Sequence, residues 1–224
     1  MHIGLIGGIG PAATMSYYQR LTSAMSAIGA RLELTIVQAD VNELIRNNLA
    51  DDCDAQARIY ADLIDRLKAA GAECAAITSL GGHFCFEETR ALSALPLVSG
   101  VTPLDDHFDA LGYRTVGLLG TAVVMRTGLY GQLRKTASIA PSDIDGFGTA
   151  YQDMAVSGAC SDAQRDYFLS EGQNLIDRGA QAIVLAGTDM NLAYDGRDVG
   201  YPVVDALDVH VEALVALAAR GADT

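Results

Sequence analysis

The feature that most constrains this chain is an internal repeat. Residues 3–8 (IGLIGG) resemble residues 116–121 (VGLLGT), and residues 71–80 (GAECAAITSL) resemble residues 179–188 (GAQAIVLAGT). The two pairs are shifted along the chain by nearly the same distance, 113 and 108 positions. A repeat that preserves both the order and the spacing of its parts indicates two copies of one supersecondary unit.

The repeat also predicts how the chain divides. We expect an N-terminal unit at residues 1–100 and a C-terminal unit at residues 101–205, with the boundary near residues 99–103. A helix expected at residues 206–220 should pack back on the first unit. A chain of 224 residues is long enough for each unit to bury its own core.

Continuous apolar runs alternate with amphipathic stretches, the pattern of parallel strands that are buried on both faces and connected by helices. The prediction is an α/β fold with two pseudo-symmetric, doubly wound parallel-sheet halves and the active site between them. Strands are expected at residues 2–6, 33–38, 74–78, 97–99, 115–119, 144–146, 182–185 and 203–204. Helices are expected at residues 12–27, 54–70, 86–94, 101–111, 123–135, 163–178 and 206–220.

Charge and composition narrow the possible partners. A formal net charge of −13 repels nucleic-acid phosphates and anionic membrane surfaces, so neither is an expected partner. The chain has no apolar run of about 18 residues and opens directly on a strand, so we expect a cytoplasmic protein. Four cysteines without a CxxC pair favour neither zinc nor disulfides. Residues 51–54 (DDCD) are interpreted as a helix N-terminus, and no metal is expected.

Ligands of open parallel sheets bind beyond the carboxyl ends of the strands. In this chain the repeat supplies two matching pairs of such loops, residues 7–11 with 120–121 and residues 78–83 with 186–189. Backbone amides near Gly8 and Gly10 are expected to hold a substrate carboxylate, although a structural turn or a nucleotide site would also fit. Thr121 and Thr188 end their strands and are candidate substrate-binding donors, and Gly187, directly before Thr188, is a further candidate substrate-binding residue.

Several of these segments carry a family resemblance. Residues 7–14 (GGIGPAAT) look like the GGMGPxAT opening of aspartate/glutamate racemases, and residues 117–121 (GLLGT) with 128–130 (GLY) resemble their mid-chain segment. Residues 179–180, 188–189 and 202–205 match in order and spacing, so the resemblance covers essentially the whole chain. It implies an isomerase-like, cofactor-independent amino-acid racemase that acts on a small carboxylate and forms a homodimer.

This chain departs from the family pattern at the residues that carry out the family's reaction. The family exchanges an α-proton through a cysteine in a CNTxH loop and a second cysteine in GCTE. Here residues 79–83 read SLGGH and residues 186–189 read AGTD, which puts Ser79 and Gly187 in the cysteine positions. A hydroxyl is a far weaker acid than a thiol, and glycine carries no side-chain proton. The resemblance therefore implies altered chemistry through a single acid/base, such as isomerisation, lyase action or decarboxylation.

The candidate catalytic residues each have a simpler alternative. His83 has the pKa range of a general acid or base but could only hydrogen-bond its own loop. Ser79 could orient substrate, act as a nucleophile or cap a helix. Asp189 could take part in the site, cap the next helix or neutralise an arginine. Arg46 lies roughly where racemases keep a substrate-binding arginine, or else on a solvated helix face. Cys85 is a weaker stand-in for the lost thiol.

Three functions remain open at this level. The first is a racemase-superfamily enzyme that transfers a proton without a cofactor. The second is a catalytically silent carboxylate-binding or regulatory protein. The third is a hydrolase or lyase that depends on Ser79.

Overall fold

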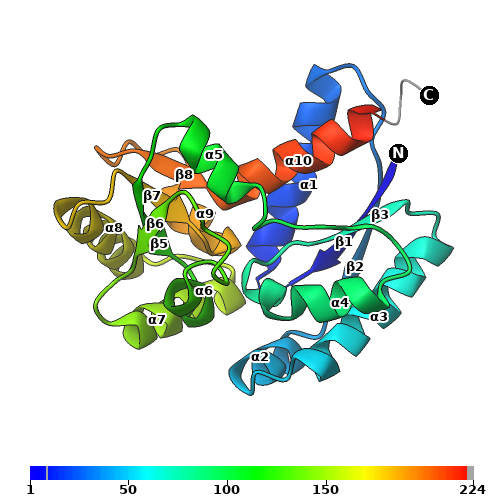
Figure 1. Cartoon of the computed structure of the whole chain (residues 1–224), viewed down its shortest axis with the longest axis horizontal. Helices are drawn as coiled ribbons and strands as arrows, with labels where there is room; N and C mark the ends of the chain where they lie inside the picture. The colour runs from blue at the N-terminus through cyan, green and yellow to red at the C-terminus, as the bar shows by residue number, and fades with distance from the viewer. Residues whose placement is uncertain (9, 221–224) are drawn as a thin grey trace.

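The computed structural model describes residues 1–8 and 10–220, which form two α/β halves side by side (Figure 1). Each half contains one four-stranded sheet, and every strand pairing within it is parallel. The strand order is β2-β1-β3-β4 in one sheet and β6-β5-β7-β8 in the other, so the halves share one topology. The predicted fold class and the repeat behind it are confirmed. The strands are β1 (His2–Gly7), β2 (Glu33–Gln38), β3 (Cys74–Ile77), β4 (Leu97–Val98), β5 (Thr115–Leu119), β6 (Ala137–Ile139), β7 (Ala182–Leu185) and β8 (Val203–Asp205).

The helices lie on the faces of the two sheets and carry the chain from each strand to the next. In the first half they are α1 (Pro11–Ala27), α2 (Val41–Leu49), α3 (Cys53–Ala69), the short 3-10 helix η1 (Gly81–Cys85) and α4 (Phe86–Leu92). In the second half they are α5 (Leu104–Ala110), α6 (Ala122–Thr127), α7 (Ile144–Ser157), α8 (Asp162–Asp177), the 3-10 helix η2 (Thr188–Met190), α9 (Asn191–Tyr194) and α10 (Ala206–Arg220).

The central strands β1, β3, β5 and β7 place their loops where a site can form. They are almost completely buried, as expected for strands covered by helices on both sides. Because all pairings are parallel, the carboxyl ends of β1 and β3 lie at one edge of the first sheet, and those of β5 and β7 at one edge of the second. The four repeated loops predicted from the sequence leave from these edges.

Helix α10 crosses from the second half and packs beside α1 (Figure 1). Its Leu207, Val211 and Leu214 are buried in one cluster with side chains of β1 and α1, including Leu5 and Leu21. Burial of several large aliphatic side chains, at about 1.5–3 kcal/mol each, makes this contact a substantial link between the halves.

The structure corrects the prediction in the second half. The expected strand at 144–146 is the first turn of α7, because the Asp143 side chain accepts a hydrogen bond from Gly146 N and caps that helix. The edge strand of the second sheet, on the side of β5 opposite β7, is β6 instead. The expected helix at 123–135 ends at Thr127, because four consecutive residues adopt left-handed φ angles of 58°, 56°, 59° and 64°. These four are residues 128–131.

Two helices also differ from the prediction, one by its presence and one by its first residue. Helix α2 lies in a stretch where none was expected, and the Asp40 side chain caps it by accepting a hydrogen bond from Glu43 N. Helix α5 begins at Leu104 rather than at residue 101. Within the described part of the chain, no helix combines the length and the apolar character that crossing a bilayer requires.

Candidate active site

The loops after β3 and β7 meet between the two halves. Thr188 Oγ1 donates a hydrogen bond to the carbonyl oxygen of Thr78, 3.0 Å away. On the same side, a Cβ atom on Gly81 would lie 3.0 Å from Thr121 Cγ2 and 3.6 Å from Ser79 Oγ. The structure thus brings together Ser79, Thr121 and Thr188, three residues singled out from the sequence.

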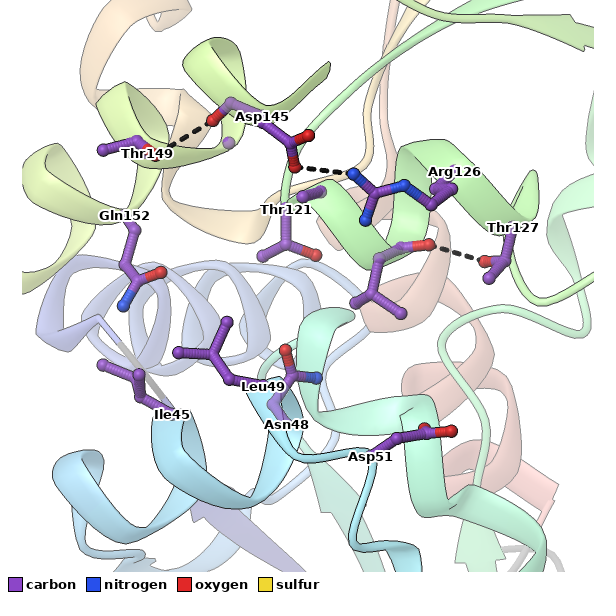
Figure 2. A pocket seen from close by; sticks show the side chains of 13 residues that line it. Ile45, Asn48, Leu49, Asp51, Thr121, Arg126, Thr127, Asp145, Thr149 and Gln152 are labelled. Atoms are coloured by element: carbon purple, nitrogen blue, oxygen red, sulfur yellow. Dashed lines mark hydrogen bonds and ion pairs between the residues drawn. The ribbon is translucent and has the colours of Figure 1, made fainter.

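A cavity of about 390 Å³ opens beside these loops, between α2 of the first half and α6 and α7 of the second (Figure 2). Cavities of this size accommodate small metabolites. Thr121 lines this cavity, and its Oγ1 is buried without a hydrogen-bond partner among the described residues. The lining residues are Ile45, Asn48, Leu49, Asp51, Thr121, Ala122, Val123, Arg126, Thr127, Asp145, Gly148, Thr149 and Gln152.

Arg126 is the cationic side chain among these lining residues, and the sequence reasoning missed it. It comes from α6, and its guanidinium donates to the Asp145 carboxylate of α7 over 2.6 Å (Figure 2). Half-exposed ion pairs of this kind contribute about 1 kcal/mol or less, so an anionic ligand can compete for the guanidinium. The sequence signal that could have identified Arg126 as a site residue is its position, five residues after Thr121 of the glycine-turn loop.

Arg46 does not line the cavity. Its side chain is 65 % exposed and pairs with Glu43 one turn earlier on α2. The solvated helix face, the simpler of the two interpretations of Arg46, describes this geometry. Asn48 of the same helix faces inward instead and donates to the carbonyl oxygen of Gly81 over 3.1 Å.

His83 is buried and both of its ring nitrogens have partners. Nδ1 lies 2.8 Å from the Ser79 carbonyl oxygen, and Nε2 accepts a hydrogen bond from Gly100 N over 3.0 Å. This pattern requires the neutral ring with its proton on Nδ1. Burial lowers the pKa of His83 to about 4, which also favours the neutral form. His83 therefore holds the β3 loop to the segment after β4, and neither nitrogen faces the Ser79 hydroxyl.

The Ser79 hydroxyl sits in a tight part of the site. It is 5 % exposed, and its Oγ accepts a hydrogen bond from Gly82 N over 3.3 Å. Gly8 packs directly against the Ser79 side chain, so that any Cβ on Gly8 would collide with it. Gly8 is thus required for close packing of the first and third strand loops.

The N-terminus of α1 is filled by a carboxylate from the other half. Asp189 Oδ1 accepts a hydrogen bond from Ala13 N over 2.8 Å. Gly10 permits this approach, since a Cβ there would meet the carboxylate. We expected the amides near Gly8 and Gly10 to hold a substrate carboxylate, and in the structure the chain supplies its own. Burial raises the pKa of Asp189 to about 6.

Gly187 lies at the carboxyl end of β7, and the Tyr151 ring of α7 fills the space beside it. A Cβ atom on Gly187 would lie 2.5 Å from Tyr151 Cζ and 2.9 Å from its hydroxyl oxygen. The Tyr151 hydroxyl donates to Asp189 Oδ2 over 3.4 Å and accepts from Asp189 N over 3.5 Å. No sequence pattern distinguishes Tyr151 from the other tyrosines of the chain, which number nine in all.

The four cysteines are all free and none is activated. Burial is the largest cause that raises the pKa of each thiol, and it raises that of Cys85 to about 12. A thiol with a raised pKa forms little thiolate near neutral pH. In the described residues, no group of three His, Cys, Asp or Glu side chains is arranged to hold a metal ion.

The fold defines a two-lobed α/β protein with a cavity between its halves. The chain belongs to the Asp/Glu/hydantoin racemase family, whose model matches residues 6–214.

Several solved structures share this fold. A candidate Asp/Glu racemase from Yersinia pestis is 26 % identical, with a TM-score of 0.78 over 98 % of this chain and 100 % of that one. An aspartate racemase homologue from Pyrococcus horikoshii is 22 % identical, with a TM-score of 0.76 over 97 % and 99 %. Aspartate racemase from Picrophilus torridus is 20 % identical, with a TM-score of 0.79 over 98 % and 95 %. The last two comparisons support the fold alone.

Proposed function

We propose that this protein is a racemase-type enzyme that moves a proton on a small carboxylate or amino acid, without a cofactor, in the cavity between its halves. The observation that carries the proposal is the placement of Thr121. Thr121 lines a cavity of about 390 Å³ next to the meeting point of the β3 and β7 loops, and its buried hydroxyl has no hydrogen-bond partner among the described residues. Family membership supports the reaction type, and the relatives named above are aspartate or Asp/Glu racemases by description.

The lining residues support an anionic substrate. Arg126 provides a guanidinium that can form two parallel hydrogen bonds with a carboxylate. Thr121 and Asn48 add a hydroxyl and an amide, while Ile45 and Leu49 offer an apolar wall. In this arrangement Arg126 takes the substrate-binding role that we expected of Arg46.

The proposed chemistry differs from exchange between two thiols. Ser79 and Gly187 replace the family's cysteines by our alignment, and the four thiols have raised pKa values. Because both ring nitrogens of His83 are engaged, we assign it a positioning role rather than proton transfer. We assign proton transfer to the buried carboxylate of Asp189, whose pKa burial raises to about 6, with Thr188 holding its loop against the first half.

The test is proton exchange. The protein is incubated in deuterated water with a panel of amino acids and dicarboxylic acids, and loss of the α-proton signal is followed by NMR. Exchange that falls at least tenfold in Thr121→Val, but not in Thr136→Val, supports the proposal, since Thr136 is buried outside the cavity. Absence of exchange with every acid contradicts it.

A carboxylate-binding protein without activity is the second candidate, because Asp189 already fills the α1 N-terminus and Tyr151 fills the space beside Gly187. It predicts thermal stabilisation by a small acid without any α-proton exchange.

Hydrolysis through Ser79 has less support, since no ring nitrogen of His83 reaches its hydroxyl. Covalent labelling of Ser79 by a serine-directed reagent would revive it. The cytoplasmic location and the homodimer remain predictions.

A further inference from the structure

A tyrosine side chain occupies the place of the second cysteine of the family pattern. The space that a side chain on Gly187 would need is occupied by the Tyr151 ring, whose hydroxyl oxygen lies 2.9 Å from the Cβ position. A side chain at 187 would therefore have to displace this ring. The side chain that carries an exchangeable proton at this place therefore comes from α7 and not from the loop after β7.

Tyr151 is also joined to a carboxylate. Its hydroxyl lies 3.4 Å from Asp189 Oδ2, and Ala13 N holds the other carboxylate oxygen. Both side chains are 2 % exposed, and the hydrogen-bond partners of the carboxylate in the described chain are amide and hydroxyl groups rather than a cation. A buried carboxylate without a cation is costly to ionise, and such groups cluster at functional sites.

Helix α7 connects the pair to the cavity, although Tyr151 and Asp189 are themselves buried and do not line it. Gly148 and Gln152 line the cavity, and Tyr151 is three residues after the one and adjacent to the other on α7. Residues three apart are neighbours on a helix surface, so Tyr151 lies beside Gly148, on the buried side of the α7 residues that line the cavity.

We propose that Tyr151 and Asp189 form a proton relay that replaces the missing side chain at position 187. The relay deepens the proposed proton-transfer function and rests on it. In the forward step the substrate Cα–H bond breaks, and its electron pair stays on the substrate as an enolate-type anion. The proton goes to the Tyr151 hydroxyl oxygen while the hydroxyl proton moves to Asp189 Oδ2. The reverse step returns a proton to the same carbon and restores the pair.

The hydrogen bond between Tyr151 and Asp189 is long, at 3.4 Å. Catalytic hydrogen bonds are often long before substrate binds and shorten in the complex, which fits the 3.4 Å separation. The pKa of about 6 for Asp189 leaves its carboxylate ionised at neutral pH and still able to hold a proton briefly. Because the relay approaches one face of the substrate, exchange should proceed with retention of configuration.

The experiment compares two matched losses of a buried hydroxyl. Tyr151→Phe keeps the ring beside Gly187, and Tyr194→Phe removes a hydroxyl that bonds the Phe168 carbonyl and Tyr201, none of which lines the cavity. With an acid that the wild type exchanges, Tyr151→Phe should lower the α-deuterium exchange rate about 100-fold or more, while Tyr194→Phe retains it. Asp189→Asn should abolish the rise of the rate between pH 5 and 7.

The outcomes separate the two proposals. Wild-type exchange that is faster than loss of optical purity, together with the loss in Tyr151→Phe, supports the relay. Undiminished exchange in Tyr151→Phe, or loss of optical purity as fast as exchange, overturns the relay and leaves the proposed function standing. No exchange by the wild type with any acid removes the proposed function, and the relay falls with it.

Discussion

Thr188 Oγ1 donates a hydrogen bond to the carbonyl oxygen of Thr78, 3.0 Å away across the junction of the two halves. These residues are not repeat equivalents, but each lies in the loop that follows an equivalent strand, β3 or β7. The bond therefore fixes the two pseudo-symmetric loops against each other. The cavity that contains Thr121 depends on this contact for its position.

Arg126 should govern carboxylate binding. Replacing it by glutamine removes a charged hydrogen-bond donor worth about 1.5–3 kcal/mol, so the dissociation constant for a bound acid should rise roughly 10- to 100-fold. Calorimetric titration measures the change, and Arg46→Gln is the control because its side chain points to solvent. Equal weakening by both variants would indicate a general charge effect rather than a binding residue.

Gly187→Ala should destabilise the protein. The new methyl group would meet the Tyr151 ring, and overpacking of a buried site costs about 1–3 kcal/mol of unfolding free energy. Urea unfolding provides the measurement. Gly196→Ala tests a glycine with nothing within 4 Å of its Cβ position, although its φ of 72° adds backbone strain. A Gly187→Ala protein as stable as the wild type would mean that Tyr151 does not occupy the assigned place.

The pH dependence of stability should report the burial of Asp189. Burial raises its pKa from 3.8 to about 6, so between these values the folded protein binds a proton that the unfolded chain does not. The stability lost to the buried charge at pH 7 is thus regained as the pH falls through 6. At about 1.4 kcal/mol per pKa unit, this recovery approaches about 3 kcal/mol once the pH is below both pKa values, and most of it is present by pH 4.

Asp189→Asn should lack that recovery. Its unfolding free energy should fall, relative to wild type, by up to about 3 kcal/mol between pH 7 and pH 4. The lowered pKa values of His83 and His210 destabilise both proteins equally as the pH falls, so they cancel in the comparison. Parallel curves for the two proteins would show that Asp189 is not buried in a carboxylate-disfavouring site.

The fold could be predicted from the sequence because the patterns that indicate it are local and occur twice along the chain. The central strands are continuous apolar runs, and their glycine-turn loops recur at nearly one spacing, so topology and loop positions followed directly. The failures also have local causes. The Asp143 cap that starts α7 was overlooked, and the run of left-handed residues that begins at Gly128 leaves little trace in hydrophobic periodicity.

The site was harder to predict because it is made across the two halves. Nothing in the sequence around Asp189 indicates that its carboxylate reaches Ala13, 176 residues away. The contact of Tyr151 with Gly187 likewise depends on how α7 packs. Residues 79–83 and 186–189 could be recognised as site loops, but the direction of each side chain required the three-dimensional arrangement.

The most direct measurement is a crystal structure with the small acid that most raises the melting temperature. We expect its carboxylate in the cavity, within hydrogen-bond distance of Thr121 Oγ1 and the Arg126 guanidinium. An acid bound instead in the groove formed by Pro11, Ser16 and Asn191, with this cavity unoccupied, would contradict the assignment of the site.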